Sequence, residues 1–173
     1  MSPAPAVRRL TAPTATELDA LGHVLVDCVA GGASVSFMHP LSFERARAFW
    51  QQVAEGVARG ERALLVADDA HGICGTVQLL LDQPENQPHR ADLAKMLVHR
   101  RARQRGLGAA LLAAADVEAR RHGKTLLVLD TASPEAERLY QRAGWQRSGS
   151  IPGYALLPQG GLCVTTFYYR ELR

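Results

Sequence analysis

Four arginines within residues 100–105 stand directly before Gly106 and Gly108, in the segment HRRARQRGLGAALLAAAD (residues 99–116). The apolar residues that follow predict a helix over about 106–122. The first backbone N–H groups of a helix have no internal partner, and the helix dipole adds positive charge there. Glycine removes a Cβ that would keep a phosphate away, and arginine supplies charge-assisted hydrogen bonds. The segment therefore has the chemistry of an anion site, for a small polyphosphate or for nucleic acid.

Several kinds of anion site can be compared with this segment. A Walker loop needs a lysine and a hydroxyl residue after its last glycine, and neither follows Gly108. A dinucleotide-binding turn needs a third glycine where Leu111 stands. A nucleic-acid patch would carry interleaved aromatic residues, which this segment lacks. The polyphosphate site and an ordinary solvated charge run beside a helix start both stay open at this point.

The composition is that of an ordinary globular protein with one domain over residues 1–173, of which residues 1–5 are expected to be flexible. The net charge is only +3, so no nucleic-acid partner is expected. Cys28, Cys74 and Cys163 form no C-x-x-C motif, and the six histidines are scattered, so no metal is expected. No apolar run is long enough for a signal peptide core or a membrane span, which predicts a cytoplasmic protein without a membrane partner.

The elements that must position the basic segment follow from periodicity and caps. Strands are predicted at residues 7–10, 63–67, 73–81, 91–98, 125–130, 145–150 and 162–170, with a loop containing Pro152 and Gly153 before the last one. Helices are predicted after the capping box Thr14/Glu17, after Ser42, over 106–122, and from Ser133-Pro134 to Ala143. This order predicts an α/β fold whose central mixed, mostly antiparallel sheet of six to seven strands is flanked by about four helices, with a parallel pair between 91–98 and 125–130.

Two segments carry a resemblance to a known family. Residues 98–108 resemble the acetyl-CoA signature of the GNAT superfamily, R/Q-x-x-G-x-G/A after a strand ending in valine, with Arg103, Gly106 and Gly108 at its fixed positions and Arg100 where a proline is common. LDTASPEAERLYQRAGW (129–145) resembles the second signature of that family. The resemblance implies a GNAT fold and an N-acetyltransferase that uses acetyl-CoA without a metal, by direct attack of an amine in a ternary complex. It implies cofactor contacts at Met96, Leu97, Val98, Arg103, Gln104, Arg105, Gly106, Leu107, Gly108, Ala109 and Ser133.

Acetyl transfer to an amine needs a base for the amine, donors for the oxyanion and an acid for the leaving thiolate. The resemblance assigns the oxyanion donor to a backbone N–H at Leu97 or a neighbour, and the acid to Tyr140, whose phenol has an ordinary pKa of about 10. Tyr140 packed against the sheet is the structural alternative. Asp92, which by period two shares a strand face with Met96 and Val98, and Asp130 on the next strand are the candidate bases. A chain of waters is the alternative to both.

A narrower resemblance concerns the acceptor. HRADLAKMLVHRRARQRGLG (89–108) and GSIPGYALLPQGGLCVTTFYYREL (149–172) resemble the group of the tabtoxin-resistance acetyltransferase, with Asp92 in place of a glutamate. That resemblance implies a small-molecule amine acceptor, amino-acid-like or toxin-like, beside Phe37, Met38 and Tyr154. A non-catalytic CoA-binding sensor and an acetyltransferase for a protein N-terminus are the alternatives. The final strands also allow a homodimer by edge pairing.

Overall fold

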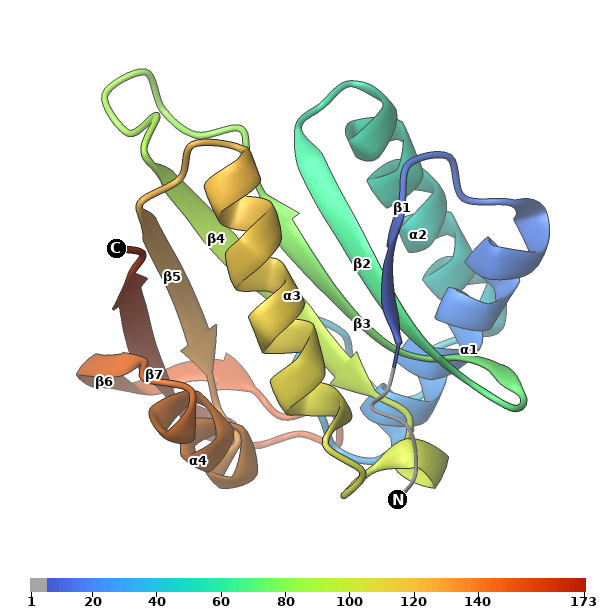
Figure 1. Cartoon of the computed structure of the whole chain (residues 1–173). Coiled ribbons are helices and arrows are strands. Elements are labelled where there is room, and N and C mark those ends of the chain that lie inside the picture. The colour runs from blue at the N-terminus through green and yellow to red at the C-terminus, as the bar shows by residue number, and fades with distance from the viewer. Residues whose placement is uncertain (1–5) are drawn as a thin grey trace.

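Seven strands and four α-helices form in the computed structural model, which describes residues 6–173 (Figure 1). The expected flexibility of residues 1–5 concerns a segment outside the described residues. The sheet has the order β1-β2-β3-β4-β5-β7-β6, in which β4 and β5 are parallel and the other neighbours are antiparallel. The predicted fold class is confirmed. The strands are β1 Val7–Leu10, β2 Arg62–Asp69, β3 Gly72–Leu80, β4 Arg90–Val98, β5 Leu126–Thr131, β6 Gln146–Leu156 and β7 Leu162–Glu171.

The helices begin where the predicted caps stand. Thr14 accepts a hydrogen bond from the N–H of Glu17 and forms a full capping box, Ser42 caps the second helix, and Ser133 caps the fourth with Pro134 at its first turn. The helices are α1 Ala15–Ala30, α2 Phe43–Ala58, α3 Leu107–Arg121 and α4 Pro134–Arg142, and a short 3₁₀ turn, η1 Arg100–Ala102, lies in the predicted basic loop. Each cap satisfies a backbone N–H that the helix itself cannot.

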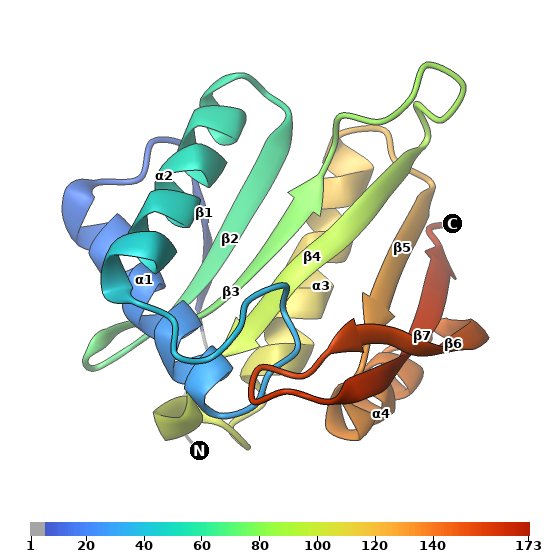
Figure 2. The ribbon, with the colours of Figure 1, turned by 180° about the vertical axis from the view of Figure 1, so that it is seen from behind.

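The sheet separates two layers of helices. α3 and α4 cover one face, and α1 and α2 cover the other, as the front and back views show (Figures 1 and 2). The apolar cluster under α3 includes Leu111 and Leu127, and the cluster under α1 and α2 is built around Trp50, which is fully buried. Apolar burial on both faces stabilises the central strands and fixes their register.

β4 changes face in its middle, and this corrects one prediction. Ala91 and Leu93 pack in the cluster under α3, but beyond Lys95 it is Met96 and Val98 that face this cluster, while Leu97 joins the opposite one. Lys95 has φ +50°, and the pairing of β4 with β3 shifts register there. A bulge of this kind reverses the alternation of side chains. The expectation that Asp92 shares a face with Met96 and Val98 is therefore wrong.

The C-terminal hairpin is longer than predicted. β6 continues through Pro152 and Gly153, where a loop was expected, and its pairing with β7 shifts register between Ile151 and Ala155. Proline is tolerated because β6 is an edge strand and the irregularity needs no ladder N–H there. The hairpin lies beside the loop after α1 (Figure 2), and the N–H of His39 donates to the carbonyl oxygen of Pro158 at 2.9 Å. This contact holds the two segments together.

Candidate active site

A cleft of about 1250 Å³ opens where β4 and β5 separate. Their parallel pairing extends from Arg90 opposite Leu126 to Asp92 opposite Val128 and goes no further, so the remainder of β4 is free of β5. The cleft exceeds the range of about 300–1,000 Å³ that small ligands occupy, and it suits an elongated molecule. The predicted cofactor residues on its wall are Met96, Leu97, Val98, Arg103, Gln104, Gly106, Leu107, Gly108, Ala109 and Ser133. Arg105 is exposed and does not line the cleft.

The start of α3 forms one side of this cleft. Gly106 is the N-cap residue in the left-handed region at φ +76°, and no side chain caps the helix. A Cβ built on Gly106 would meet no atom within 4 Å, so the space beside it is open. The N–H groups of the first turn, which lack intrahelical acceptors, border that space. An uncapped helix start beside an open left-handed glycine fits a diphosphate.

Gly108 serves a different purpose from Gly106. A Cβ built on Gly108 would lie 2.8 Å from Cδ2 of Leu139, which belongs to α4. Glycine at this position therefore lets α3 and α4 approach each other. The sequence predicts that both glycines make room for phosphate, and the structure shows that Gly108 also packs closely against Leu139.

The four arginines of the basic segment divide into two pairs. Arg100 donates from its backbone N–H and from Nε to the carboxylate of Asp27, each at 2.9 Å, and Arg101 Nε donates to Asp69 at 3.0 Å. Arg103 Nε donates to the carbonyl oxygen of Val98 at 3.2 Å, at the wall of the cleft. Arg100 and Arg101 thus fasten the loop to the protein, and of the four arginines it is Arg103 that lines the cleft.

Asp27 accepts the hydrogen bonds that hold Arg100 and the basic loop in place. Burial raises the pKa of its carboxyl, but the hydrogen bonds from the backbone and guanidinium of Arg100, together with His99, outweigh burial and lower that pKa overall. The Asp27 side chain is 14% exposed. Because a carboxylate that accepts several hydrogen bonds resists protonation, Asp27 stays charged and holds the basic loop at neutral pH.

Tyr140, on the last turn of α4, lines the cleft. Its side chain is 4% exposed and packs against Trp145 and Tyr168, with ring centroids 5.8 Å and 6.1 Å away. Burial, and next the negative charge of Asp130, raise the pKa of the Tyr140 phenol well above its ordinary value. The phenol therefore keeps its proton over the physiological pH range and remains a hydrogen-bond donor at the wall of the cleft.

The two candidate bases occupy different positions. Asp130, near the end of β5, lines the cleft, and the pKa of its carboxyl is raised overall. Burial is the largest cause; the positive charge of Lys95 opposes it, and the negative charge of Asp92 adds to it. A raised pKa makes a carboxylate a better base near neutral pH. Asp92 accepts a hydrogen bond from Arg90 and lines neither this cleft nor the cavity beside it. Asp130 and Tyr140 therefore both line the cleft, and Asp92 does not.

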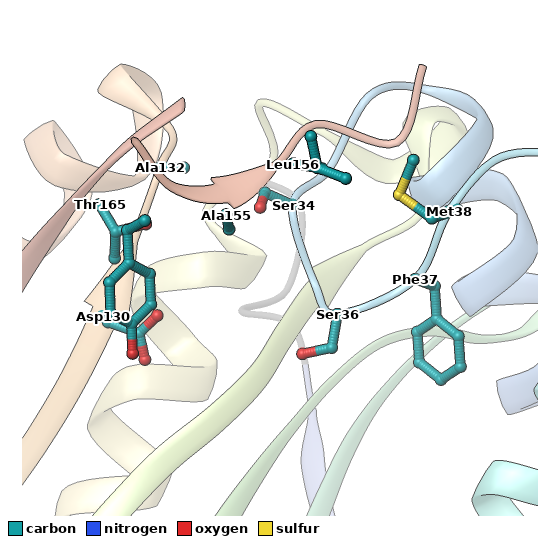
Figure 3. Close-up of a pocket in the computed structure, with 10 residues that line it drawn as sticks. Ser34, Ser36, Phe37, Met38, Asp130, Ala132, Ala155, Leu156 and Thr165 are labelled. Carbon is teal, nitrogen blue, oxygen red and sulfur yellow. The ribbon is translucent and has the colours of Figure 1, made fainter. Parts of the chain in front are cut away.

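A smaller cavity of about 250 Å³ adjoins the cleft (Figure 3). The predicted acceptor residues Phe37, Met38 and Tyr154 all line it. Ser34, Ser36, Asp130 and Ala132 border both spaces, so the two communicate. The wall comes from the loop after α1 and from the C-terminal hairpin, which are far apart in the sequence.

Three functional candidates were not predicted from the sequence. Ser36 and Thr165 line the smaller cavity, and Lys95 lines the cleft beside Met96. The position of Lys95 inside the predicted cofactor strand was a usable signal, since the chain has only one other lysine, Lys124. Within residues 6–173, no group of three or more metal-ligating side chains forms, and no helix is long and apolar enough to cross a membrane.

The chain matches a family profile described as an acetyltransferase (GNAT) domain, over residues 60–147, which is just over half of its length. These residues run from the start of β2 to the start of β6 and include the cleft wall at 96–109 and Tyr140.

Solved structures of similar shape include an N-acetyltransferase from Staphylococcus aureus Mu50, at 20% identity and TM-score 0.80, with 98% of this chain and 99% of that chain covered. A GNAT superfamily phosphinothricin acetyltransferase from Sinorhizobium meliloti, in complex with acetyl-CoA, has 18% identity and TM-score 0.80 over 98% of this chain and 89% of its own. A ribosomal-protein-alanine N-acetyltransferase from Brucella melitensis has 22% identity and TM-score 0.79 over 96% and 99%. At these identities the likeness establishes the fold.

Proposed function

The chain belongs to the GNAT acetyltransferase family, and on that premise we propose that it transfers the acetyl group of acetyl-CoA to the amine of a small polar acceptor. The observation that carries this proposal is that the large cleft and the smaller cavity share part of their walls. The cleft beside the uncapped start of α3 suits an elongated diphosphate, and it opens at Asp130 into a cavity of amino-acid size. A donor and an acceptor can therefore meet at one carboxylate.

The donor side is proposed to hold acetyl-CoA by its diphosphate. The N–H groups of residues 106–109 and the side chains of Arg103 and Gln104 would bind the phosphate oxygens, since these residues line the cleft beside Gly106. Arg105, which is exposed and next to Gly106 in the sequence, would add positive charge to the site. Backbone groups of Met96, Leu97 and Val98 on the free part of β4 would hold the pantetheine arm. Ser133, which caps α4 and borders the cleft, would contact acetyl-CoA from the side opposite β4.

The chemistry is proposed to use two side chains of the cleft. Acetyl-CoA supplies the activated thioester when it is bound. Asp130 would accept a proton from the acceptor's ammonium group, either directly or through a water, because its raised pKa brings it closer to neutral. Asp92 would act through Asp130, since its negative charge contributes to that raised pKa. As the C–S bond breaks, Tyr140 would give its phenol proton to the departing sulfur and regain one from the nitrogen of the new amide. A backbone N–H at Leu97 or a neighbour would hydrogen-bond the acetyl oxygen.

The acceptor is proposed to be a small amino-acid-like molecule, as in the tabtoxin-resistance group that the sequence resembles. The volume of the smaller cavity, about 250 Å³, supports this class over a large substrate. The phosphinothricin acetyltransferase from Sinorhizobium meliloti, which has the same fold, is named for a small-molecule acceptor, and this supports the same class. We also propose that residues 6–173 form one domain, because β1 and the C-terminal hairpin belong to a single sheet.

Two measurements test the proposed function. Acetyl-CoA at about 100 times its Kd should stabilise the folded chain by roughly 2.7 kcal/mol, which raises the Tm by about 5–10 °C for a chain of this size. Release of free CoA thiol should depend on an added amine, in a panel of amino acids, aminoglycosides, polyamines and a peptide with an N-terminal alanine. Stabilisation without thiol release from any amine would favour a CoA-binding sensor. A folded chain that acetyl-CoA does not stabilise would refute the donor site.

A further inference from the structure

Lys95 occupies an unusual place in the wall of the cleft. It sits at the bulge of β4, in the left-handed backbone region at φ +50°, where a side chain other than glycine costs about 1 kcal/mol or more. The bulge turns Lys95 out of the regular alternation of the strand and into the cleft. A basic residue held in a strained conformation at a cavity wall is a candidate for a functional role.

The ammonium group of Lys95 is poorly satisfied by the protein itself. Its polar contact in the described part of the chain is a long hydrogen bond, 3.4 Å from Nζ to Oγ of Ser36, and Nζ lies 5.6 Å from the ring centroid of Phe49. An ammonium has three donors, so two remain unused. Burial lowers the pKa of Lys95, the negative charge of Asp130 opposes this, and the positive charge of Arg62 adds to it. A half-buried cation at a cavity wall, with donors that the protein does not use, favours an anionic partner.

Ser36 and Asp130 fix where such a partner would lie. Both border the cleft and the smaller cavity, and in Figure 3 the Ser36 hydroxyl points from the loop after α1 into the space that Asp130 borders from β5. The pair formed by Lys95 and Ser36 therefore stands at the junction of the two spaces. A molecule of amino-acid size in the smaller cavity would reach this pair and Asp130 at the same time.

We propose that Lys95 and Ser36 form an anion-binding subsite, and that the preferred acceptor carries a carboxylate beside its reacting amine. This inference rests on the proposed function and names its acceptor class. Lys95 Nζ and Ser36 Oγ donate hydrogen bonds to the acceptor carboxylate, while the amine faces Asp130. Lys95 is then a specificity-determining residue.

Charge balance supports the selection of acids over simple amines. A cationic acceptor without an acidic group would bring a positive charge close to the Lys95 ammonium, and like charges in a partly buried site repel. An acceptor carboxylate removes that repulsion and adds a charge-assisted hydrogen bond. Asp130 alone cannot neutralise both the Lys95 ammonium and the ammonium of an acceptor. The site therefore discriminates by charge as well as by size.

The test compares matched acceptors in matched variants. Thiol release gives kcat/KM for L-methionine and L-methioninamide, and for L-phenylalanine and its amide. The ratio of acid to amide is compared in the wild type, Lys95→Met, Lys95→Arg and Ser36→Ala. Comparison of the ratio between proteins cancels the different basicities of the acid and the amide. Lys95→Met should lower the ratio by about tenfold or more, chiefly through KM for the acid, since a charge-assisted hydrogen bond is lost. Lys95→Arg should keep most of the preference for the acid, and Ser36→Ala should lower the ratio less than Lys95→Met does.

The control is Arg45→Met, which removes one positive charge from an exposed position on α2 that borders neither space. It should leave the ratio unchanged. Calorimetric titration of the CoA complex with L-methionine and L-methioninamide tests the same subsite without turnover. Equal ratios in the wild type and Lys95→Met, or equal affinities for acid and amide, would overturn the subsite while acetylation of amines continues to support the proposed function. Acetylation of Lys95 itself by acetyl-CoA alone, detected by mass spectrometry, would also overturn it, because Lys95 would then be a nucleophile.

Discussion

The two glycines at the start of α3 should respond differently to alanine. Gly106 has φ +76° with open space where a Cβ would stand, so Gly106→Ala meets no atom but forces alanine into the left-handed region. That conformation costs about 1 kcal/mol, or roughly 2–4 °C in Tm. The methyl group would enter the space proposed for the diphosphate. Loss of one charge-assisted hydrogen bond, about 1.5–3 kcal/mol, would weaken acetyl-CoA binding by roughly 10- to 150-fold.

Gly108→Ala should leave acetyl-CoA binding nearly intact. Its methyl group would point at Leu139 Cδ2, 2.8 Å away on α4, and not into the open space beside Gly106. The Leu139 side chain is flexible at its end and can move, and alanine favours the helix by about 1 kcal/mol over glycine. We therefore expect a stability change within about 1 kcal/mol of zero and an acetyl-CoA Kd within roughly threefold of the wild type.

Gly60→Ala provides the control for backbone strain. Gly60 has φ +74° and, like Gly106, no atom within 4 Å of a Cβ, but it follows α2 and borders neither space. It should lose the same stability as Gly106→Ala and keep its acetyl-CoA affinity. Urea unfolding and calorimetric titration with acetyl-CoA measure both quantities. An unchanged acetyl-CoA affinity in Gly106→Ala would show that the diphosphate does not bind beside Gly106. A loss of acetyl-CoA affinity in Gly108→Ala as large as that in Gly106→Ala would contradict the packing explanation.

Three other variants test the remaining parts of the site. Tyr140→Phe should lower kcat by about 10²–10⁴ without changing the acetyl-CoA Kd, because its ring contacts stay, and an unchanged kcat would exclude the acid role. In a pH profile, kcat/KM of the wild type should rise as Asp130 loses its proton, at a pH above the usual aspartate range, and Asp130→Asn should lack this rise. The folded-state pKa of Asp27 is lowered, so its stabilisation is present above the unfolded pKa of about 3.9 and is lost as the pH falls through the folded value. Asp27→Asn should therefore unfold more easily at pH 7, by about 1–3 kcal/mol, and its stability should depend less on pH below 4.

The parts of the fold that depend on local chemistry could be predicted from the sequence. Thr14, Ser42 and Ser133 each cap a helix because a hydroxyl can satisfy an N–H two or three residues later, whatever the rest of the chain does. Apolar runs of strand length likewise gave seven strands and one parallel pair. The predicted cofactor residues 96–98, 103, 104 and 106–109 do line the cleft, since the glycines and Arg103 form a local pattern that resembles a known signature, whereas Arg105 does not line it. The homodimer and the cytoplasmic location stay predictions.

The use of each arginine could not be predicted, because it depends on partners distant in the sequence. Arg100 and Arg101 look identical to Arg103 and Arg105 in a charge count, yet the first two are paired with Asp27 and Asp69, 73 and 32 residues away. Only the fold brings those carboxylates to the loop. A run of four arginines therefore overstates the positive charge that is free to bind an anion.

The bulge at Lys95 is the feature that links the fold to the proposed specificity. Period-two alternation is a property of regular strands, and no residue type in ADLAKMLV marks the point where β4 leaves it. Without the bulge, Asp92 would share the face of Met96 and Val98, as the regular pattern predicts, and Lys95 would follow the opposite face of the strand. With it, Met96 and Val98 turn to the α3 side, and Lys95 reaches Ser36 at the junction of the two spaces. The same irregularity thus separates Asp92 from the cofactor strand and supplies a cation to the acceptor side, so the charge preference of the acceptor follows from backbone geometry and not from a sequence motif.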